Sequence, residues 1–400
     1  QIFVSHLLYQ SMIDQLNIKE KMQIDDQLII IATNAFFTAL KSSFRKSGKG
    51  NWNQFIYIYN YGYFDKRKIR REILRLFLEK SIIKNTYNII YKVFIEKKDE
   101  RKLQKFIDEK CRENNETIYY VISCEKLPFQ GLFGYVGIIL AMVKYALEKN
   151  MVPVVDLKNN PNTYLEENEV GKINSWELFF QQFTKKSIDE IYEKCKYVVG
   201  NHMDIDWNNL PNMRGVKRRD LCAYWSVMYR NYIKFSPQAE AYCQKEYDTL
   251  LKGKEAETLG VLVRGTDIKT CKGHALQPSL EQVEDEIRKV LKKDKRFKYI
   301  YLATEEKKSE EYLKEKFPGI IITNERTYYD TLDYQKGLSY VNLDGIKTKY
   351  DRGIEYLSSM NLLSKCGGLV AGQCGGSFAA FYMNGGKYRY TYFWDIGVVE

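Results

Sequence analysis

Residues 259–267 read LGVLVRGTD, and this stretch decides the fold class because an apolar run ends here at a charged residue. A short apolar run bounded by glycine and polar residues predicts a buried strand, here residues 259–263. Ser279, followed three positions later by Gln282, forms a capping-box pattern that predicts the start of a helix. A second β-rich run, YIYLA, begins at Tyr299. Strand, helix and strand in this order are typical of a parallel sheet.

The same alternation continues to the end of the chain. Apolar runs predict further strands, and helical spacing of apolar residues predicts further helices. The strands are expected at 320–323 and 368–371, and the helices at 308–317, 353–365 and 377–383. Residues 254–400 are therefore expected to form one doubly wound, Rossmann-like α/β domain.

The first half of the chain carries a second unit of this type. Residues 117–124 read TIYYVISC and predict a buried strand, and a turn containing Gly131 and Gly134 follows. The next elements expected are a helix at 138–150, a strand at 152–156 and helices at 187–197 and 237–253. We therefore expect a second Rossmann-like domain over residues 116–253, preceded by a helical extension over residues 1–115.

Basic residues are concentrated in the extension. Residues 41–110 contain 19 Lys and Arg against 8 Asp and Glu, an excess equal to the net charge of +11 of the whole chain. Such a segment is typical of contact with anionic lipid, a lipid-linked phosphate or nucleic acid, and equally of a solvated helix face. No known nucleic-acid-binding motif accompanies it, so we expect no nucleic acid, and two readings stay open: a solvated helix face and peripheral contact with the inner membrane surface.

The spacing of cysteine and histidine in the sequence does not favour a metal site or a disulfide framework. The 8 cysteines form no CxxC pair, and there are 3 histidines. This pattern predicts reduced thiols and no bound metal. The sequence contains no apolar run of about 20 residues, the length of a membrane span, and no secretory signal opens it. We therefore expect a cytoplasmic protein, associated with a membrane only at its surface.

Arg264 is the leading candidate for a ligand contact. It follows the carboxyl end of a predicted strand, where open α/β sheets bind ligands. A guanidinium there suits a pyrophosphate and stabilises the charge of a departing nucleoside diphosphate. The alternative is a structural ion pair between Arg264 and Asp267. His274, in the loop that follows, is a candidate to take a proton from an acceptor or to bind phosphate, and otherwise a polar surface residue.

Two further turns follow predicted strands. Thr304 and Glu305 directly follow the strand at 299–303. A carboxylate there is able to accept hydrogen bonds from a nucleobase edge or from ribose hydroxyls. The alternative is an acidic residue that only stabilises the N-terminus of the next helix. Residues 372–377 read GQCGGS and join a strand to a helix. Such a turn is typical of phosphate binding by backbone N–H groups, or of a tight connection only. Its candidate contacts are Cys374, Gly375, Gly376 and Ser377.

The first half offers weaker candidates of the same kind. Gly131 and Gly134 open the predicted helix of that domain and are expected to line the cleft between the two domains. Asp156 ends the next strand and is a candidate to orient an acceptor or to serve as a base.

With these residues in place, the chain resembles the GDP-fucose-dependent fucosyltransferase superfamily over residues 117–400, most closely its bacterial polysaccharide-locus members and more distantly the α1,6-fucosyltransferases. Residues 262–267 match the family's arginine motif, 301–305 its strand ending in Ala-Thr-Asp, and 356–371 the helix and strand before its phosphate turn. Residues 131–134 and 154–156 resemble the glycine loop and strand of its first domain.

The resemblance implies a GT-B architecture, inversion at the anomeric carbon and no metal requirement. It assigns the donor pyrophosphate to Arg264 and guanine to Glu305. The sequence departs from the family in three places: Leu262 replaces a guanine-contacting histidine, Gly265 replaces a second arginine, and Lys272 stands where the α1,6 enzymes carry their proposed base. The base is therefore His274, Asp267 or Asp156, or there is no dedicated base.

The function expected from the sequence is transfer of a sugar, fucose from GDP-fucose, to a hydroxyl of a glycan or lipid-linked oligosaccharide. No cofactor is expected beside this nucleotide-sugar donor. Two alternatives stay open. One is a GT-B transferase with another donor, such as a UDP-sugar, and the other is a non-catalytic module that binds a nucleotide or nucleic acid.

Overall fold

The computed structural model describes residues 97–399, except 111–112, 115, 128, 208–209, 266–272 and 330–346. Most of the basic segment therefore lies outside the described residues, and so does Asp267. From Asp99 onward the chain forms one compact unit. Among the helices described in it, none is long and apolar enough to cross a membrane.

The first sheet has three parallel strands in the order β2-β1-β3. They are β1 (Ile118–Ser123), β2 (Val152–Asp156) and β3 (Lys196–Val199). The first two confirm the strands predicted from their apolar runs, and β2 is buried along its whole length. The edge strand β3, with the sequence KYVV, was not predicted, because the helix expected at 187–197 overlaps it, whereas α10 ends at Lys194.

The second sheet has five parallel strands in the order β6-β5-β4-β7-β8. They are β4 (Thr258–Val263), β5 (Tyr299–Thr304), β6 (Ile321–Ile322), β7 (Gly368–Ala371) and β8 (Tyr390–Phe393). Numbered along the chain, this is the order 3-2-1-4-5 of a doubly wound sheet. The chain builds outward from β4 in one direction and then returns to its other side at β7, so the order reverses between β4 and β7.

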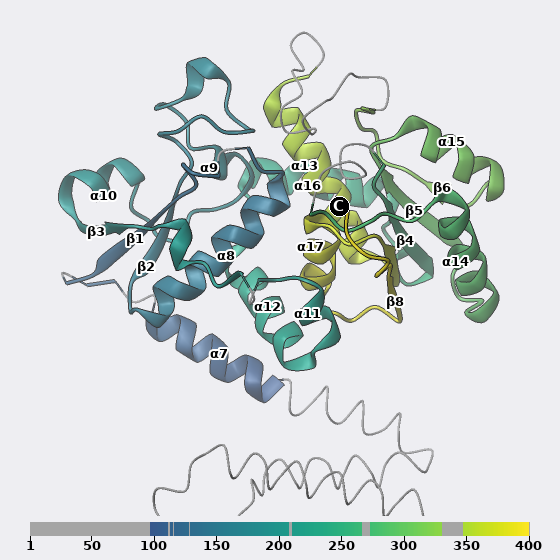
Figure 1. The fold of residues 1–400 in the computed structure, drawn as a ribbon, viewed down its shortest axis with the longest axis horizontal. Coiled ribbons are helices and arrows are strands. Elements are labelled where there is room, and N and C mark those ends of the chain that lie inside the picture. Colours follow the sequence, from purple (N-terminus) through teal and green to yellow (C-terminus); the bar gives the residue numbers. More distant parts are fainter. Residues whose placement is uncertain are drawn as a thin grey trace, which may run out of the picture. The chain divides into compact units, whose positions relative to one another are not determined.

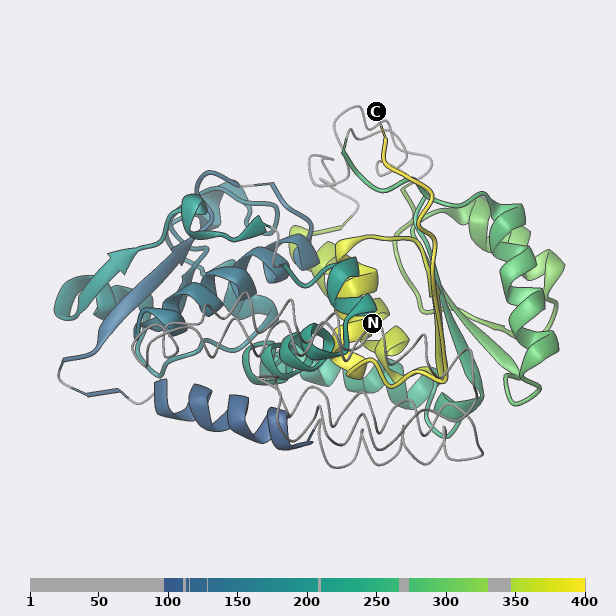
Figure 2. The same ribbon diagram turned by 60° about the horizontal axis from the view of Figure 1, so that its bottom comes forward.

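The helices cover both sheets (Figures 1 and 2). The α-helices are α7 (Lys97–Lys110), α8 (Leu132–Glu148), α9 (Ser175–Phe179), α10 (Ile188–Lys194), α11 (Met213–Lys217), α12 (Arg219–Tyr232), α13 (Pro237–Leu250), α14 (Leu280–Lys293), α15 (Lys307–Lys316), α16 (Lys349–Lys365) and α17 (Gly375–Asn384). Short 3-10 turns occur at Glu167–Glu169, His202–Asp204 and Glu255–Glu257. The capping box that predicted the start of α14 is present, with Ser279 and Gln282 bonded reciprocally.

The second sheet is buried on both faces, as a parallel sheet requires. Val261 and Val263 pack in a cluster with residues of α14, whereas Leu262 faces the cluster that contains α16 and α17. That larger cluster also contains β1 and α8 of the first half. Helices α8, α16 and α17 therefore join the two halves through one apolar core, in the middle of Figure 1.

The structure confirms the predicted class, an α/β protein with two parallel sheets. The boundaries predicted for its two domains stay predictions. Helix α8 begins at Leu132, earlier than the predicted residue 138, because Gly131 serves as its N-cap residue.

Candidate functional site

The candidate site lies where the order of the second sheet reverses. Arg264 follows β4, the glycine turn at residues 372–377 follows β7, and these two strands are paired from Leu259↔Gly368 to Leu262↔Ala371. Since parallel neighbours end at the same edge of a sheet, the arginine and the turn lie next to each other. Such a reversal point is where open α/β sheets form a ligand crevice.

Arg264 is held by Glu305, at the end of the neighbouring strand β5. The Nε of Arg264 donates to Oε1 of Glu305 at 2.8 Å, and the backbone N–H of Gly265 donates to the same oxygen at 3.1 Å. The side chain of Glu305 is 3% exposed and that of Arg264 is 15% exposed. The buried carboxylate of Glu305 therefore fixes Arg264 at the end of β4, while part of the Arg264 side chain stays exposed to solvent.

The electrostatics of Glu305 follow from this arrangement. Burial by itself raises the pKa of the carboxyl, but the charges of Arg264 and Arg326 and the two hydrogen bonds outweigh burial, so the pKa of Glu305 is lowered. Glu305 is consequently an anion that compensates part of the positive charge at this edge of the sheet.

Tyr356 of α16 connects the arginine with both glycine turns, and sequence analysis did not single it out as a ligand-site residue. Its ring lies 5.9 Å from Cζ of Arg264 and 5.3 Å, edge to face, from the ring of Phe133. Its hydroxyl lies directly over Gly376, where any side chain would overlap with it. Burial raises the pKa of this phenol, so the hydroxyl stays protonated and able to donate.

The two predicted glycine turns meet. A Cβ on Gly375 would lie 3.2 Å from the backbone carbonyl of Phe133 and 3.4 Å from N of Gly134, so the starts of α17 and α8 approach closely. The structure thus brings Gly131 and Gly134 of the first half to the turn that follows β7.

Within the turn after β7, the side chains of Cys374 and Ser377 cap their own helix. Cys374 N donates to Oγ of Ser377 at 3.0 Å, and Ser377 N donates to Sγ of Cys374 at 3.4 Å. Ser377 is fully buried. The N–H groups of Gly375 and Gly376 belong to the first turn of α17, where a helix has no internal acceptor for them. Any phosphate contact of this turn therefore falls to these two glycines.

A second guanidinium, that of Arg326, lies near enough to Glu305 for its charge to lower the pKa of that carboxyl, and sequence analysis missed it. Two hydrogen bonds anchor the segment that follows Arg326. Thr327 N donates to Oε2 of Glu355 at 2.8 Å, and Tyr329 N donates to the carbonyl of Glu305 at 2.9 Å. Among the described residues, Nε of Arg326 is buried without a hydrogen-bond partner. Arg326 lies far from Arg264 in the sequence, and no motif marks it.

The position of Gly265 explains one departure from the family motif. A Cβ there would overlap with the carboxylate of Glu306, which is 1% exposed and accepts a hydrogen bond of 2.6 Å from Oγ of Ser309. The fold thus has no room for a second arginine directly after Arg264.

The loop after Arg264 brings a glutamine to the glycine turn. Gln277 donates to the carbonyl of Gln373 at 3.2 Å, and its Oε1 lies so close to Gly372 that a side chain there would overlap with it. His274 is exposed, and its backbone carbonyl accepts from Val399 N at 2.8 Å. The loop after Arg264 thus lies beside the glycine turn, and the role of His274 as a base stays a prediction.

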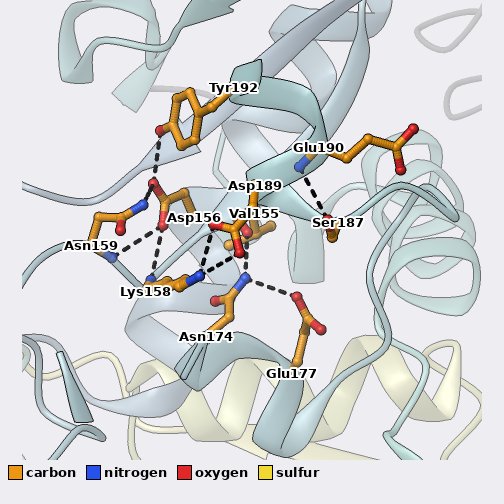
Figure 3. A network of polar contacts seen from close by, with 10 residues as sticks. All are labelled: Val155, Asp156, Lys158, Asn159, Asn174, Glu177, Ser187, Asp189, Glu190 and Tyr192. Atoms are coloured by element: carbon orange, nitrogen blue, oxygen red, sulfur yellow. Dashed lines mark hydrogen bonds and ion pairs between the residues drawn. The ribbon is translucent and has the colours of Figure 1, made fainter. Parts of the chain in front are cut away.

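Asp156 and Thr304 are buried and engaged within the protein. The carboxylate of Asp156 accepts hydrogen bonds from Lys158 N at 2.9 Å, Asn159 N at 3.3 Å, Asn159 Nδ2 at 2.8 Å and the hydroxyl of Tyr192 at 2.8 Å (Figure 3). Thr304 is 2% exposed, and its hydroxyl accepts from Glu306 N. Asp156 thus organises the turn after β2, and we assign it no part in the reaction below.

Within the part of the chain that the structure describes, no three His, Cys, Asp or Glu side chains are grouped closely enough to hold a metal ion.

No protein-family model and no curated protein matches the chain. Among solved structures it is similar to NodZ α1,6-fucosyltransferase soaked with GDP-fucose, with 14% identity, 70% of this chain and 96% of that chain covered and a TM-score of 0.42. It is similar to the apo form of POFUT1, with 11% identity, coverage of 71% and 99% and a TM-score of 0.42. A mutant of Arabidopsis thaliana FUT1 in complex with GDP shows 12% identity, coverage of 77% of each chain and a TM-score of 0.38.

Proposed function

We propose that this protein is a glycosyltransferase that uses a nucleotide-activated sugar, GDP-fucose. The observation that carries the proposal is the meeting of Arg264, held by Glu305, with the glycine turns that open α8 and α17. Guanidinium and free backbone N–H groups at one edge of a sheet form a site for a diphosphate. The assignment of guanine and fucose follows the resemblance of the sequence motifs.

In this proposal the site stabilises the leaving group of the transfer reaction. The acceptor hydroxyl oxygen forms a bond to the anomeric carbon, the bond from that carbon to the β-phosphate oxygen breaks, and the nucleoside diphosphate leaves with the electron pair. Arg264 and Arg326 place two positive charges against one buried carboxylate, Glu305. Charge that develops on the diphosphate would be stabilised there without rearrangement of the site.

The acceptor in this proposal is a glycan or a lipid-linked oligosaccharide, whose hydroxyl attacks the anomeric carbon of the donor with inversion. Its proton needs a destination. Since Asp156 is saturated with hydrogen bonds, His274 and Asp267 are the candidates that remain, and His274 is tested first. Replacement of His274 by Gln should reduce turnover and leave donor binding unchanged if it takes the proton.

Another nucleotide-sugar donor is the second candidate, and the geometry of Glu305 favours keeping it. The resemblance assigns guanine to this residue, whereas its Oε1 is occupied by Arg264 and Gly265 and its side chain is nearly inaccessible. In our proposal Glu305 positions Arg264, and another group contacts the base.

A thermal-shift screen with GDP, GDP-fucose, GDP-mannose, UDP, UDP-sugars and CMP tests both candidates. A ligand at about 100 times its Kd adds about 2.7 kcal/mol to the stability of the folded state. We expect a shift with GDP compounds that is unchanged by EDTA and lost in Arg264→Ala. Arg288→Ala is the matched control, because Arg288 is exposed on α14 and its contacts are with Glu284 of the same helix and with the end of α15, at Lys316 and Phe317.

The outcomes separate the readings. A shift only with UDP compounds would replace the donor and keep the site, and a shift abolished by EDTA would overturn metal independence. No shift with any nucleotide, or a full shift in Arg264→Ala, would refute the donor site. Oligonucleotide binding without nucleotide-sugar binding would support the non-catalytic alternative.

A further inference from the structure

A second crevice lies in the first half of the protein, where β1 and β3 end. It has a volume of about 220 Å³. Ser123, the last residue of β1, and Val199, the last residue of β3, line it together with the segments that follow each strand. Ile138 and Met142 of α8 form its apolar wall. It is thus lined by elements of the first half alone.

The topology of the first sheet makes this a ligand position. The chain runs from β1 through α8 to β2 on one side of β1, and then returns to the other side of β1 to form β3. The order of strands therefore reverses between β1 and β3, as it does between β4 and β7 in the second sheet. Crevices outside the carboxyl ends of such strand pairs are where open α/β sheets bind ligands.

His202 lines this crevice, and one nitrogen of its ring has no hydrogen-bond partner in the described part of the chain. Nδ1 of His202 is buried and accepts or donates no hydrogen bond among the described residues. The imidazole sits on a short, well-anchored turn: Asn201 N donates to Oδ2 of Asp204 at 2.9 Å, and the hydroxyl of Tyr120 donates to the same oxygen at 2.6 Å. A buried polar atom without a partner costs free energy, and a bound hydroxyl group would recover it.

The lining indicates a neutral ligand with both polar and apolar faces. Ser123, Asn201 and His202 offer neutral hydrogen-bonding groups, while Ile138 and Met142 are apolar. Glu125 and Lys126 contribute one charge of each sign. The crevice therefore lacks the excess of positive charge that a phosphate needs, in contrast to the site of Arg264 and Arg326.

The crevice is connected with the donor site through one face of α8. Gly134, Ile138 and Met142 follow each other at intervals of four residues, so they lie on one stripe of the helix. Gly134 meets the turn at Gly375, and the next two positions of the stripe line the crevice. With a rise of about 1.5 Å per residue, Ile138 lies about 6 Å farther along the helix than Gly134.

We propose that the crevice between β1 and β3 binds one neutral sugar ring, a unit of the acceptor glycan, through a hydrogen bond to Nδ1 of His202. As an acceptor site it rests on the transferase function proposed above. A sugar ring presents hydroxyl groups at its edge and C–H groups on its faces, which matches the polar and apolar sides of the crevice.

The histidine content makes the test direct. The chain has 3 histidines, so the imidazole signals in an NMR spectrum of histidine-labelled protein are few, and His202→Gln identifies those of His202. The probes are the methyl glycosides of glucose, galactose, mannose and N-acetylglucosamine, added up to about 100 mM because a single ring is expected to bind with a Kd of about 1–10 mM. We expect at least one of them to move the His202 signals saturably and to leave those of His274 in place.

Two variants check that the crevice itself is responsible. Ile138→Phe should fill it and remove the response, and Ile118→Phe, which adds the same ring at the exposed start of β1, should not. Should Ile138→Phe fail to fold, His202→Leu takes its place, with binding measured as saturation transfer to the sugar's own signals. The expected result is at least a 10-fold rise in Kd.

Each outcome decides the proposal. A site-selective response that is lost on filling the crevice supports it, and GDP should still stabilise Ile138→Phe, which separates this site from the donor site. No response to any glycoside, or an equal response of His274, would overturn it. A response to inorganic phosphate or GDP alone would overturn the assignment of a neutral ligand. If GDP failed to bind the wild type while the sugar response persisted, the transferase function would fail and the sugar site would stand.

Discussion

Replacement of Gly265 by alanine tests the packing that fixes the start of the ligand loop. The new methyl group would overlap with the carboxylate of Glu306, which would have to leave its place. Glu306 is 1% exposed and accepts a hydrogen bond of 2.6 Å from Ser309, and Lys308 lies 3.4 Å from its other oxygen. A hydrogen bond to a charged group contributes about 1.5–3 kcal/mol, so we expect Gly265→Ala to lower the free energy of unfolding by about 2–3 kcal/mol.

Urea unfolding of the ligand-free protein, followed by circular dichroism, measures this change. Gly137→Ala is the control, because a Cβ at Gly137 has its nearest neighbour at 3.9 Å and alanine favours the interior of α8 by up to about 1 kcal/mol. Gly265→Ala should therefore lower the free energy of unfolding, and Gly137→Ala should raise it.

A double-mutant cycle isolates the cause. In a Glu306→Ala background the obstacle is gone, and adding Gly265→Ala should change the unfolding free energy by less than about 0.5 kcal/mol. Wild-type stability of Gly265→Ala, or an equal loss in both backgrounds, would refute the account of why this position carries glycine.

Three further predictions concern single charges. Arg326→Gln should weaken the binding of GDP about 10- to 100-fold in calorimetry and leave the binding of guanosine unchanged. The control Arg288→Gln should change the affinity for neither ligand. An equal loss of affinity for GDP and guanosine would contradict a phosphate contact of Arg326. Because the pKa of Glu305 is lowered in the folded state, its stabilisation is present above the unfolded value of about 4.3 and is lost as pH falls through the folded pKa. Glu305→Gln should therefore flatten the fall of Tm below about pH 5, and an unchanged profile would argue against it. Asp156→Asn should cost about 1–3 kcal/mol of stability and leave GDP affinity intact, whereas full stability with lost transfer would restore Asp156 as a base.

The strands of both sheets that lie in the core could be predicted because each is a short apolar run with a clear end. β4, β5 and β7 are buried throughout or nearly so, and all three were expected within one residue of their bounds. Helix α12 was not expected, because its mixed sequence has buried residues only in its second half. The strand β3 was missed because its short run, KYVV, directly follows α10 and overlaps the end of the helix expected there.

The candidate site divides in the same way. Arg264, Glu305 and the glycine turns follow strands directly, so the rule that ligands bind at the carboxyl ends of strands was enough to select them. Arg326 and Tyr356 reach the same place through long-range contacts with Glu305 and Gly376. Sequence spacing carries no information about such contacts, because they depend on how two loops and a helix pack.

The contrast between the two reversal points gives the strongest physical reason to treat them as sites for different ligands. The one after β4 and β7 has two guanidinium groups near Glu305, whereas the one after β1 and β3 has neutral donors and acceptors, one charge of each sign and apolar side chains. Guanidinium groups at the end of a strand suit an anion, and an unpaired imidazole nitrogen is satisfied by a hydroxyl. Because α8 borders both, a diphosphate and a neutral ring held in these places would lie within a few turns of the same helix. Transfer between two such ligands is the reaction that this pairing of sites favours.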